Sequence, residues 1–174
     1  MHNLIKRYNL QNRVLFTGVN WFKGFNYKDM NNVYNVMDVF LLTTSGEGFG
    51  IPIIEAMSCE VPVVVTDYTT TQELVIDNKA GLGIKLSGTE YVDMFETDSK
   101  DYDKLKMNGT MTGSWEVERG YCDIKDAAEQ ITWLYEHPLD AGEMGQNGRQ
   151  AVVEKYDFEI VAKQWEDLMN DLSG

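Results

Sequence analysis

Short runs of apolar, β-branched residues alternate along this chain with stretches that have the period of an amphipathic helix. The clearest run is Val-Pro-Val-Val-Val-Thr at residues 61–66, which is almost entirely apolar, as a strand buried on both faces should be. Similar short apolar runs lie at residues 14–16, 38–43 and 83–86. The stretches with a helical period lie between them, at about residues 27–37, 51–59 and 71–76. The alternation predicts an α/β fold, a Rossmann-like parallel sheet with flanking helices.

The second half of the chain departs from this rhythm. Residues 87–121 contain four glycines and many acidic residues without a clean period, and we expect them to form a long, irregular surface insertion. Closing helices are predicted over residues 123–172, with Asp123 as an N-cap and Pro138 ending the first of them. The last helix has an apolar stripe around Trp165, typical of a core or of a face that covers a neighbouring domain. We therefore predict a single domain over residues 1–174.

Charge and cysteine content exclude several classes of protein. The 174 residues include 15 Lys and Arg and 28 Asp and Glu, which gives a net charge of −13. Such a surface repels nucleic acid and anionic lipid, so neither is expected as a partner. No apolar run approaches the roughly 20 residues of a membrane span, and no transmembrane segment is expected. With only Cys59 and Cys122, a disulfide scaffold is not expected. We predict a cytoplasmic location, with any membrane attachment left to parts outside this sequence.

Residues 44–57, Thr-Ser-Gly-Glu-Gly-Phe-Gly-Ile-Pro-Ile-Ile-Glu-Ala-Met, are the stretch most typical of a binding site. They follow an apolar strand and open a helix, the position at which open α/β sheets bind ligands. Three glycines in five residues allow the backbone to approach a ligand, and the free N–H groups at the helix start favour a phosphate. Glu47 and Glu55 accept hydrogen bonds only, which suits the adjacent hydroxyls of a ribose or a hexose.

The same residues resemble a known family. The spacing of Glu47 and Glu55 matches the E-x7-E signature of retaining glycosyltransferases of the GT-B fold, especially family 4, whose domain is called glycosyl transferases group 1. Further segments resemble the strands and helix starts of that family, at residues 14–18, 37–45, 61–64, 71–75 and 148–149. The resemblance covers roughly residues 4–83 and 123–172, and it implies the C-terminal, donor-binding half of a GT-B enzyme.

The resemblance also implies a role for each matched position. Glu47 would be the catalytic-site acid that meets hydroxyls of the transferred sugar, and Glu55 would hold the ribose of the nucleotide. The remaining donor-binding positions that it implies are Gly48, Phe49 and Gly50, through their backbone N–H groups, and Gly18 and Asn20, near the base. No metal and no cofactor is implied, because the nucleotide diphosphate sugar is itself the donor substrate. The Asp101-Tyr102-Asp103 pattern lies in the insertion, and we expect no metal role for it.

Some features depart from the family pattern. An Arg and a Lys that grip the diphosphate in the family would precede Met1, and we expect the family's N-terminal acceptor-binding domain to lie outside this sequence. We therefore expect this chain to bind the donor, to be inactive in isolation, and to dock the missing domain through the Trp165 helix or the turn around Trp21. Glu60 stands where the family usually has glycine, which predicts a strained left-handed helix cap at a cost of about 1 kcal/mol.

The predicted function is the transfer of a hexosyl group from a nucleotide diphosphate sugar to an acceptor hydroxyl, with retention. The alternative is a non-catalytic nucleotide-sugar-binding or regulatory module on the same fold. A flavodoxin-like signalling domain is disfavoured because the acids and the lysine that it needs at its strand ends are not present. A GT-B epimerase would not be expected to show this E-x7-E context.

Overall fold

The computed structural model describes residues 2–16, 24–93 and 116–173. Contacts divide the chain into two units, Met1–Val33 and Tyr34–Gly174. The first unit contains α1 (His2–Arg7), which is followed by a series of backbone-bonded turns up to Val14. Helix α2 (Tyr27–Asn35) crosses the boundary between the units.

The strand predicted at residues 14–16 is wrong. These residues belong to no strand of the described part of the chain, and the side chain of Leu15 is 90% exposed. A run of three apolar residues specifies neither a pairing partner nor a face, so its pattern alone does not decide between strand and loop.

The second unit is built on a three-stranded parallel sheet, which confirms the predicted fold class. The strands are β1 (Phe40–Leu42), β2 (Val63–Thr66) and β3 (Gly81–Ile84), in the order β1-β2-β3. Phe40 pairs with Val63, and Val63 pairs with Gly81. A methyl group at Gly81 would lie 1.8 Å from the carbonyl oxygen of Val63, so the close approach of β3 to β2 requires glycine.

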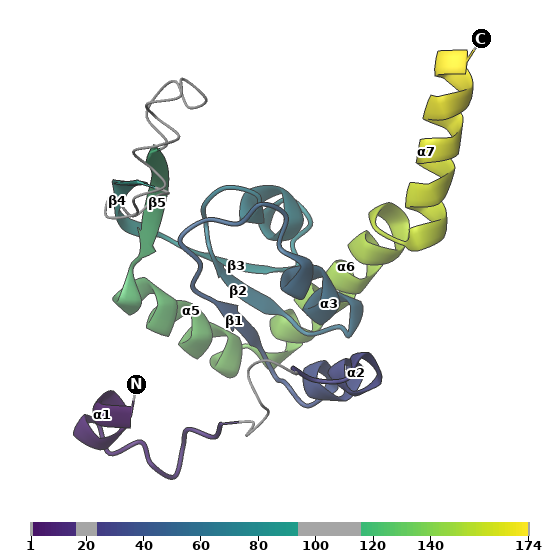
Figure 1. Cartoon of the computed structure of the whole chain (residues 1–174). Helices are drawn as coiled ribbons and strands as arrows, with labels where there is room; N and C mark the ends of the chain where they lie inside the picture. Colours follow the sequence, from purple (N-terminus) through teal and green to yellow (C-terminus); the bar gives the residue numbers. More distant parts are fainter. Residues whose placement is uncertain (1, 17–23, 94–115, 174) are drawn as a thin grey trace. The chain divides into compact units, whose positions relative to one another are not determined.

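Helices cover both faces of this sheet (Figure 1). Val64 and Ile84 pack with Ala127 and Leu134 of α5 in one buried cluster. Side chains alternate along a strand, so Val63 and Val65 point to the opposite face. The four helical elements around the sheet are α3 (Ile51–Ser58), the π-helix η1 (Gln72–Ile76), α5 (Ile124–Glu136) and α6 (Pro138–Lys155).

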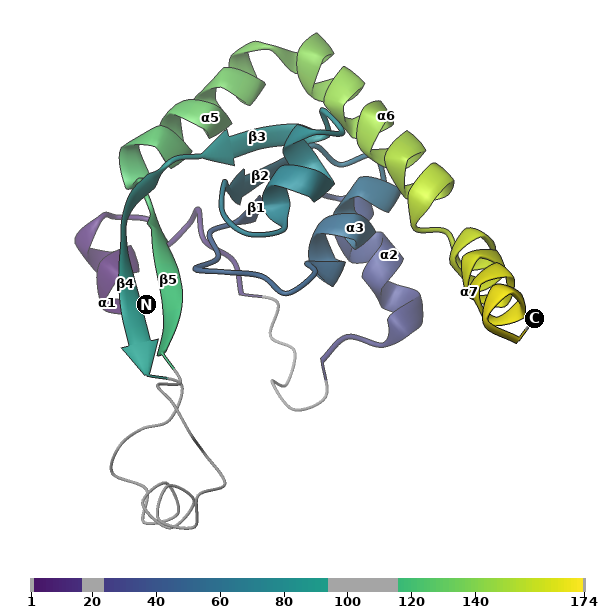
Figure 2. The ribbon, with the colours of Figure 1, turned by 90° about the horizontal axis from the view of Figure 1, so that it is seen from above.

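A β-hairpin replaces part of the irregular insertion that the sequence predicts. Strands β4 (Leu86–Asp93) and β5 (Glu116–Cys122) pair antiparallel, and β4 follows β3 after one residue (Figure 2). Irregular structure was therefore the wrong expectation for residues 87–93 and 116–121. The two strands are far apart in the sequence, and glycines and acidic residues interrupt the alternation of apolar and polar residues in each. The pattern of either strand alone therefore does not predict that they pair. Residues 94–115 lie outside the described residues.

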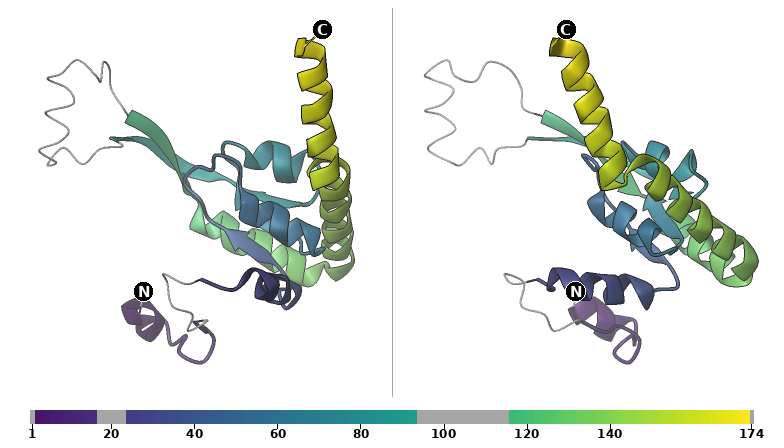
Figure 3. Two further views of the ribbon diagram at one scale, coloured as in Figure 1. Left: turned by 45° about the vertical axis from the view of Figure 1, so that its right-hand side comes forward. Right: turned by 90° about the vertical axis from the view of Figure 1, so that its right-hand side faces the viewer.

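The closing helices agree with the sequence. Asp123 caps α5, because its Oδ1 accepts hydrogen bonds from the backbone N–H groups of Lys125 (2.8 Å) and Asp126 (3.1 Å). Pro138 opens α6, and α7 (Phe158–Ser173) follows it (Figure 3). The stripe of α7 is not in a core, since Trp165 is 62% exposed. Among the described helices, none combines the length and apolar character needed to cross a membrane.

Candidate functional site

The candidate site lies at the carboxyl edge of the parallel sheet. The loop after β1 (residues 43–50) and the loop after β2 (residues 67–71) leave the sheet at this edge, because parallel strands end on the same side. Open α/β sheets bind ligands at this edge. The glycine-rich segment that the sequence singles out is the first of these loops.

Hydrogen bonds hold this loop against its neighbour. The backbone N–H of Glu47 donates to Oγ1 of Thr69 at 3.0 Å, and Oγ1 of Thr70 donates to the carbonyl oxygen of Phe49 at 3.5 Å. Within the loop, the N–H of Gly46 donates to Oγ1 of Thr44 at 3.2 Å. The position of Glu47 is therefore set by residues from two strand ends.

Gly50 makes the turn from the loop into α3. Its φ of 88° is left-handed, and a methyl group there would lie 2.9 Å from Cδ1 of Ile53. Gly48, in contrast, is exposed, and a methyl group there would meet nothing within 4 Å. Pro52 falls in the first turn of α3, where no N–H partner is needed. The loop thus presents open backbone at Gly48 beside the positive end of a helix dipole.

Glu55 lies in the second turn of α3 and is half-buried. Its Oε2 accepts a hydrogen bond of 2.8 Å from the hydroxyl of Tyr34, which is only 5% exposed. Burial and the neighbouring Glu55 raise the pKa of Tyr34 well above its usual value, so this hydroxyl stays protonated and keeps donating. Tyr34 also packs edge-to-face on Phe40, with ring centroids 5.9 Å apart. No pattern in the sequence predicts this partner for Glu55.

The hairpin brings a second unpredicted residue to the loop. The N–H of Gly120 in β5 donates to the carbonyl oxygen of Ser45 at 3.0 Å. A methyl group at Gly46 would lie 3.1 Å from Nη1 of Arg119, so the guanidinium lies against this end of the loop. Sequence reasoning missed Arg119, because it lies in the stretch that was expected to be irregular. The partial alternation of polar and apolar residues over residues 116–122 was the only sequence signal for this strand.

Several predicted positions cannot be placed. Gly18, Asn20 and the turn around Trp21 lie outside the described residues, as does the Asp101-Tyr102-Asp103 pattern. Within the residues that are described, no three His, Cys, Asp or Glu side chains gather into a group that could hold a metal ion.

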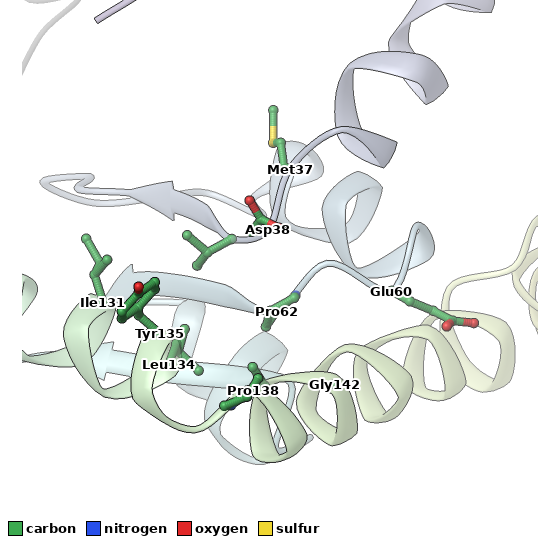
Figure 4. Close-up of a pocket in the computed structure, with 11 residues that line it drawn as sticks. Met37, Asp38, Glu60, Pro62, Ile131, Leu134, Tyr135, Pro138 and Gly142 are labelled. Carbon is green, nitrogen blue, oxygen red and sulfur yellow. The ribbon is translucent and has the colours of Figure 1, made fainter. Parts of the chain in front are cut away.

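A cavity of about 590 Å³ lies at the opposite, amino edge of the sheet (Figure 4). Residues that precede strands β1 and β2, including Asp38 and Pro62, line it together with Leu134 and Tyr135 of α5 and Pro138 of α6. None of the predicted site residues that the structure describes lines this cavity. We therefore place the candidate site at the carboxyl edge, where the glycine-rich loop and the start of α3 lie, and not in this cavity.

Comparison with known proteins identifies the family and agrees with the fold. The model of the family "Glycosyl transferases group 1" matches residues 1–112. The capsular polysaccharide biosynthesis glycosyltransferase CapM of Staphylococcus aureus is 28% identical over 142 residues, which are 82% of this chain and 28% of CapM. The O-antigen chain mannosyltransferase B of Escherichia coli is 42% identical over 65 residues, which are 36% of this chain and 16% of that protein.

A solved structure supports the same fold. A sucrose-phosphate synthase from Thermosynechococcus elongatus superposes with a TM-score of 0.69 at 23% identity, over 98% of this chain and 33% of that one. The family match covers well over half of the chain, so this protein belongs to the glycosyl transferases group 1 family, with an α/β fold of the GT-B type. The chain spans about a quarter of the length of CapM and about a third of the matched synthase.

Proposed function

We propose that this chain is the nucleotide-sugar-binding domain of a retaining glycosyltransferase. The observation that supports this most is the geometry at the carboxyl edge of the sheet. There the exposed backbone of Gly48 lies at the start of α3, between two glutamates. The full protein would transfer a hexosyl group from a nucleotide diphosphate sugar to an acceptor hydroxyl. The acceptor-binding domain would lie outside this sequence, and the chain alone would bind the donor without turning it over.

Each site residue has a role in this proposal. Glu47 accepts hydrogen bonds from hydroxyls of the transferred sugar, and Glu55 does so from the ribose. The backbone N–H groups of Gly48, Phe49 and Gly50 approach the sugar or the diphosphate. Negative charge develops on the leaving diphosphate during transfer, and preorganised N–H groups and the helix dipole stabilise it. The proposal includes no metal ion and no cofactor.

Titration of nucleotides tests the donor site. UDP, GDP and ADP, with their common sugar conjugates, are titrated by calorimetry against the 174-residue chain and its Glu55→Gln variant. Glu129→Gln, on the exposed side of α5, is the matched control for the loss of one carboxylate. We expect one base to bind in the millimolar to micromolar range, and Glu55→Gln to weaken it by about tenfold or more, since a charged acceptor is lost. If no nucleotide binds, or if both variants bind as the parent does, the proposed site is wrong.

A further inference from the structure

The guanidinium of Arg119 lies against the glycine loop, beside Gly46. In the described part of the chain, its guanidinium makes neither a hydrogen bond nor an ion pair, although the residue is half-buried. Glu90 stands directly opposite Arg119 in the hairpin register, but the carboxylate of Glu90 accepts from the hydroxyl of Tyr121 instead. A half-buried cation without a counter-charge is costly unless something else pairs with it.

The position of Arg119 is fixed by packing around the loop. A methyl group at Gly46 would touch Nη1 of Arg119 at 3.1 Å and Cε1 of Tyr68 at 3.8 Å. The hydroxyl of Tyr68 donates to the carbonyl oxygen of Glu118 at 3.4 Å, next to Arg119 in β5. Burial and Glu118 raise the pKa of Tyr68, and the charge of Arg119 partly offsets that rise. Contacts from Tyr68 and Ser45 therefore hold the hairpin so that Arg119 faces Gly46.

The base of the hairpin is fastened as well. The N–H of Lys85, just before β4, donates to Oδ2 of Asp126 at 2.8 Å, and the carbonyl oxygen of Lys85 accepts from the N–H of Asp123 at 2.8 Å. Both backbone groups of Lys85 are thus bonded to the start of α5. The hairpin is anchored at its base and again at Ser45.

We propose that Arg119 binds an oxyanion of the donor at the Glu47 end of the glycine loop. This inference rests on the proposed function and adds a residue to it. The oxyanion would be either an oxygen of the diphosphate or a carboxylate of an acidic sugar. In both cases a planar guanidinium supplies two donors in a fixed geometry. In a chain with a net charge of −13, this cation also offsets the repulsion that an anionic ligand would otherwise meet.

The test compares Arg119→Gln with Lys125→Gln, an exposed residue that loses the same charge near the hairpin. Inorganic pyrophosphate, UDP, GDP, ADP, UDP-glucose and UDP-glucuronic acid are titrated against the 174-residue chain and both variants, with the free nucleosides as references. We expect Arg119→Gln to weaken the anionic ligands by about tenfold, to leave the nucleosides unchanged, and to reduce the salt dependence of binding. A loss for every diphosphate identifies the phosphate as the bound group. A loss for the glucuronic acid conjugate alone identifies the sugar carboxylate.

Two further measurements distinguish ligand binding by Arg119 from a purely structural role of this residue. The melting temperature and the amide NMR signal of Gly120 report whether the hairpin remains in place in Arg119→Gln. The side-chain Nε signal of Arg119 in the parent chain should shift when the oxyanion ligand is added. If the parent binds nucleotides and Arg119→Gln binds them equally well, the inference is wrong and the donor site stands. If the parent binds no nucleotide, the proposed function itself fails, and the inference with it.

Discussion

The hydroxyl of Tyr34 donates a 2.8 Å hydrogen bond to Oε2 of Glu55, a residue 21 positions further along the chain. This contact joins the end of α2 to the second turn of α3. It fixes one oxygen of the carboxylate that we propose to hold the ribose. No partner of the other oxygen, Oε1, is present among the described residues, so it can accept from a ligand.

Removing the Tyr34 hydroxyl should weaken both the fold and the site. Tyr34→Phe keeps the ring contact with Phe40 but leaves Glu55 without its donor. We expect a loss of about 1.5 kcal/mol in the free energy of unfolding, the usual worth of a hydrogen bond to a charged group. Urea denaturation measures it, with Tyr135→Phe, at an exposed site, as the control. A parent-like midpoint would contradict the importance of this contact.

The same tyrosine should make the fold sensitive to alkaline pH. Its pKa is raised in the folded state by burial and by Glu55, so the folded chain holds this proton more tightly than the unfolded chain. The stability that it contributes is complete below about pH 10, the ordinary tyrosine pKa, and is lost as the pH rises above that value. The free energy of unfolding, measured between pH 8 and 11, should fall less steeply above pH 10 in Tyr34→Phe than in the parent. Equal slopes would show that Tyr34 is not the group responsible.

Two glycines of the loop should respond in opposite ways to alanine. Gly48→Ala adds a methyl group in open space, so stability should stay within about 0.5 kcal/mol. Donor binding should fall, because the proposed function has the donor approach the backbone at this glycine. Gly50→Ala combines a left-handed φ with a 2.9 Å contact, so it should destabilise the fold by about 1–3 kcal/mol. Thermal unfolding and nucleotide titration of both variants check this. Unchanged nucleotide binding in Gly48→Ala would argue against close ligand approach.

Asp126 should govern the loss of stability in acid. The N–H of Lys85, and then its ammonium group at 3.3 Å, hold the pKa of this buried carboxyl below its ordinary value. Its contribution is therefore complete above about pH 4, the ordinary pKa of Asp, and is lost as the pH falls below that value and through the lowered folded-state pKa. Asp126→Asn should lower the free energy of unfolding by about 1–3 kcal/mol at pH 7 and should make that free energy less dependent on pH between pH 5 and 2. Asp123→Asn, which preserves the N-cap, serves as the control and should change little.

Glycine at position 60 should stabilise the protein. Glu60 follows α3 with a φ of 59°, so the strained left-handed cap that the sequence predicts is present. Its backbone cannot relax easily, because its carbonyl oxygen lies 2.1 Å from where a methyl group at Gly145 would be. Glu60→Gly should raise the free energy of unfolding by about 1 kcal/mol, and Glu60→Ala should not. A stability loss in Glu60→Gly, measured by urea denaturation, would contradict the assigned strain.

Local sequence patterns were sufficient to predict the α/β class, the strand-loop-helix context of Glu47 and Glu55, and the cap at Asp123. These features are local, because hydrophobic period, glycine spacing and capping side chains act within a few residues. The family resemblance rested on the same short segments, and the match over residues 1–112 confirmed it.

Contacts between residues far apart in the chain could not be predicted from these local patterns. The pairing of β4 with β5, the bond from Tyr34 to Glu55 and the approach of Arg119 to Gly46 all join residues more than 20 positions apart. The failed strand at residues 14–16 and the exposed stripe around Trp165 have the same cause. An apolar pattern shows that a surface could be buried, but the partner that would cover it is set by the packing of the whole fold.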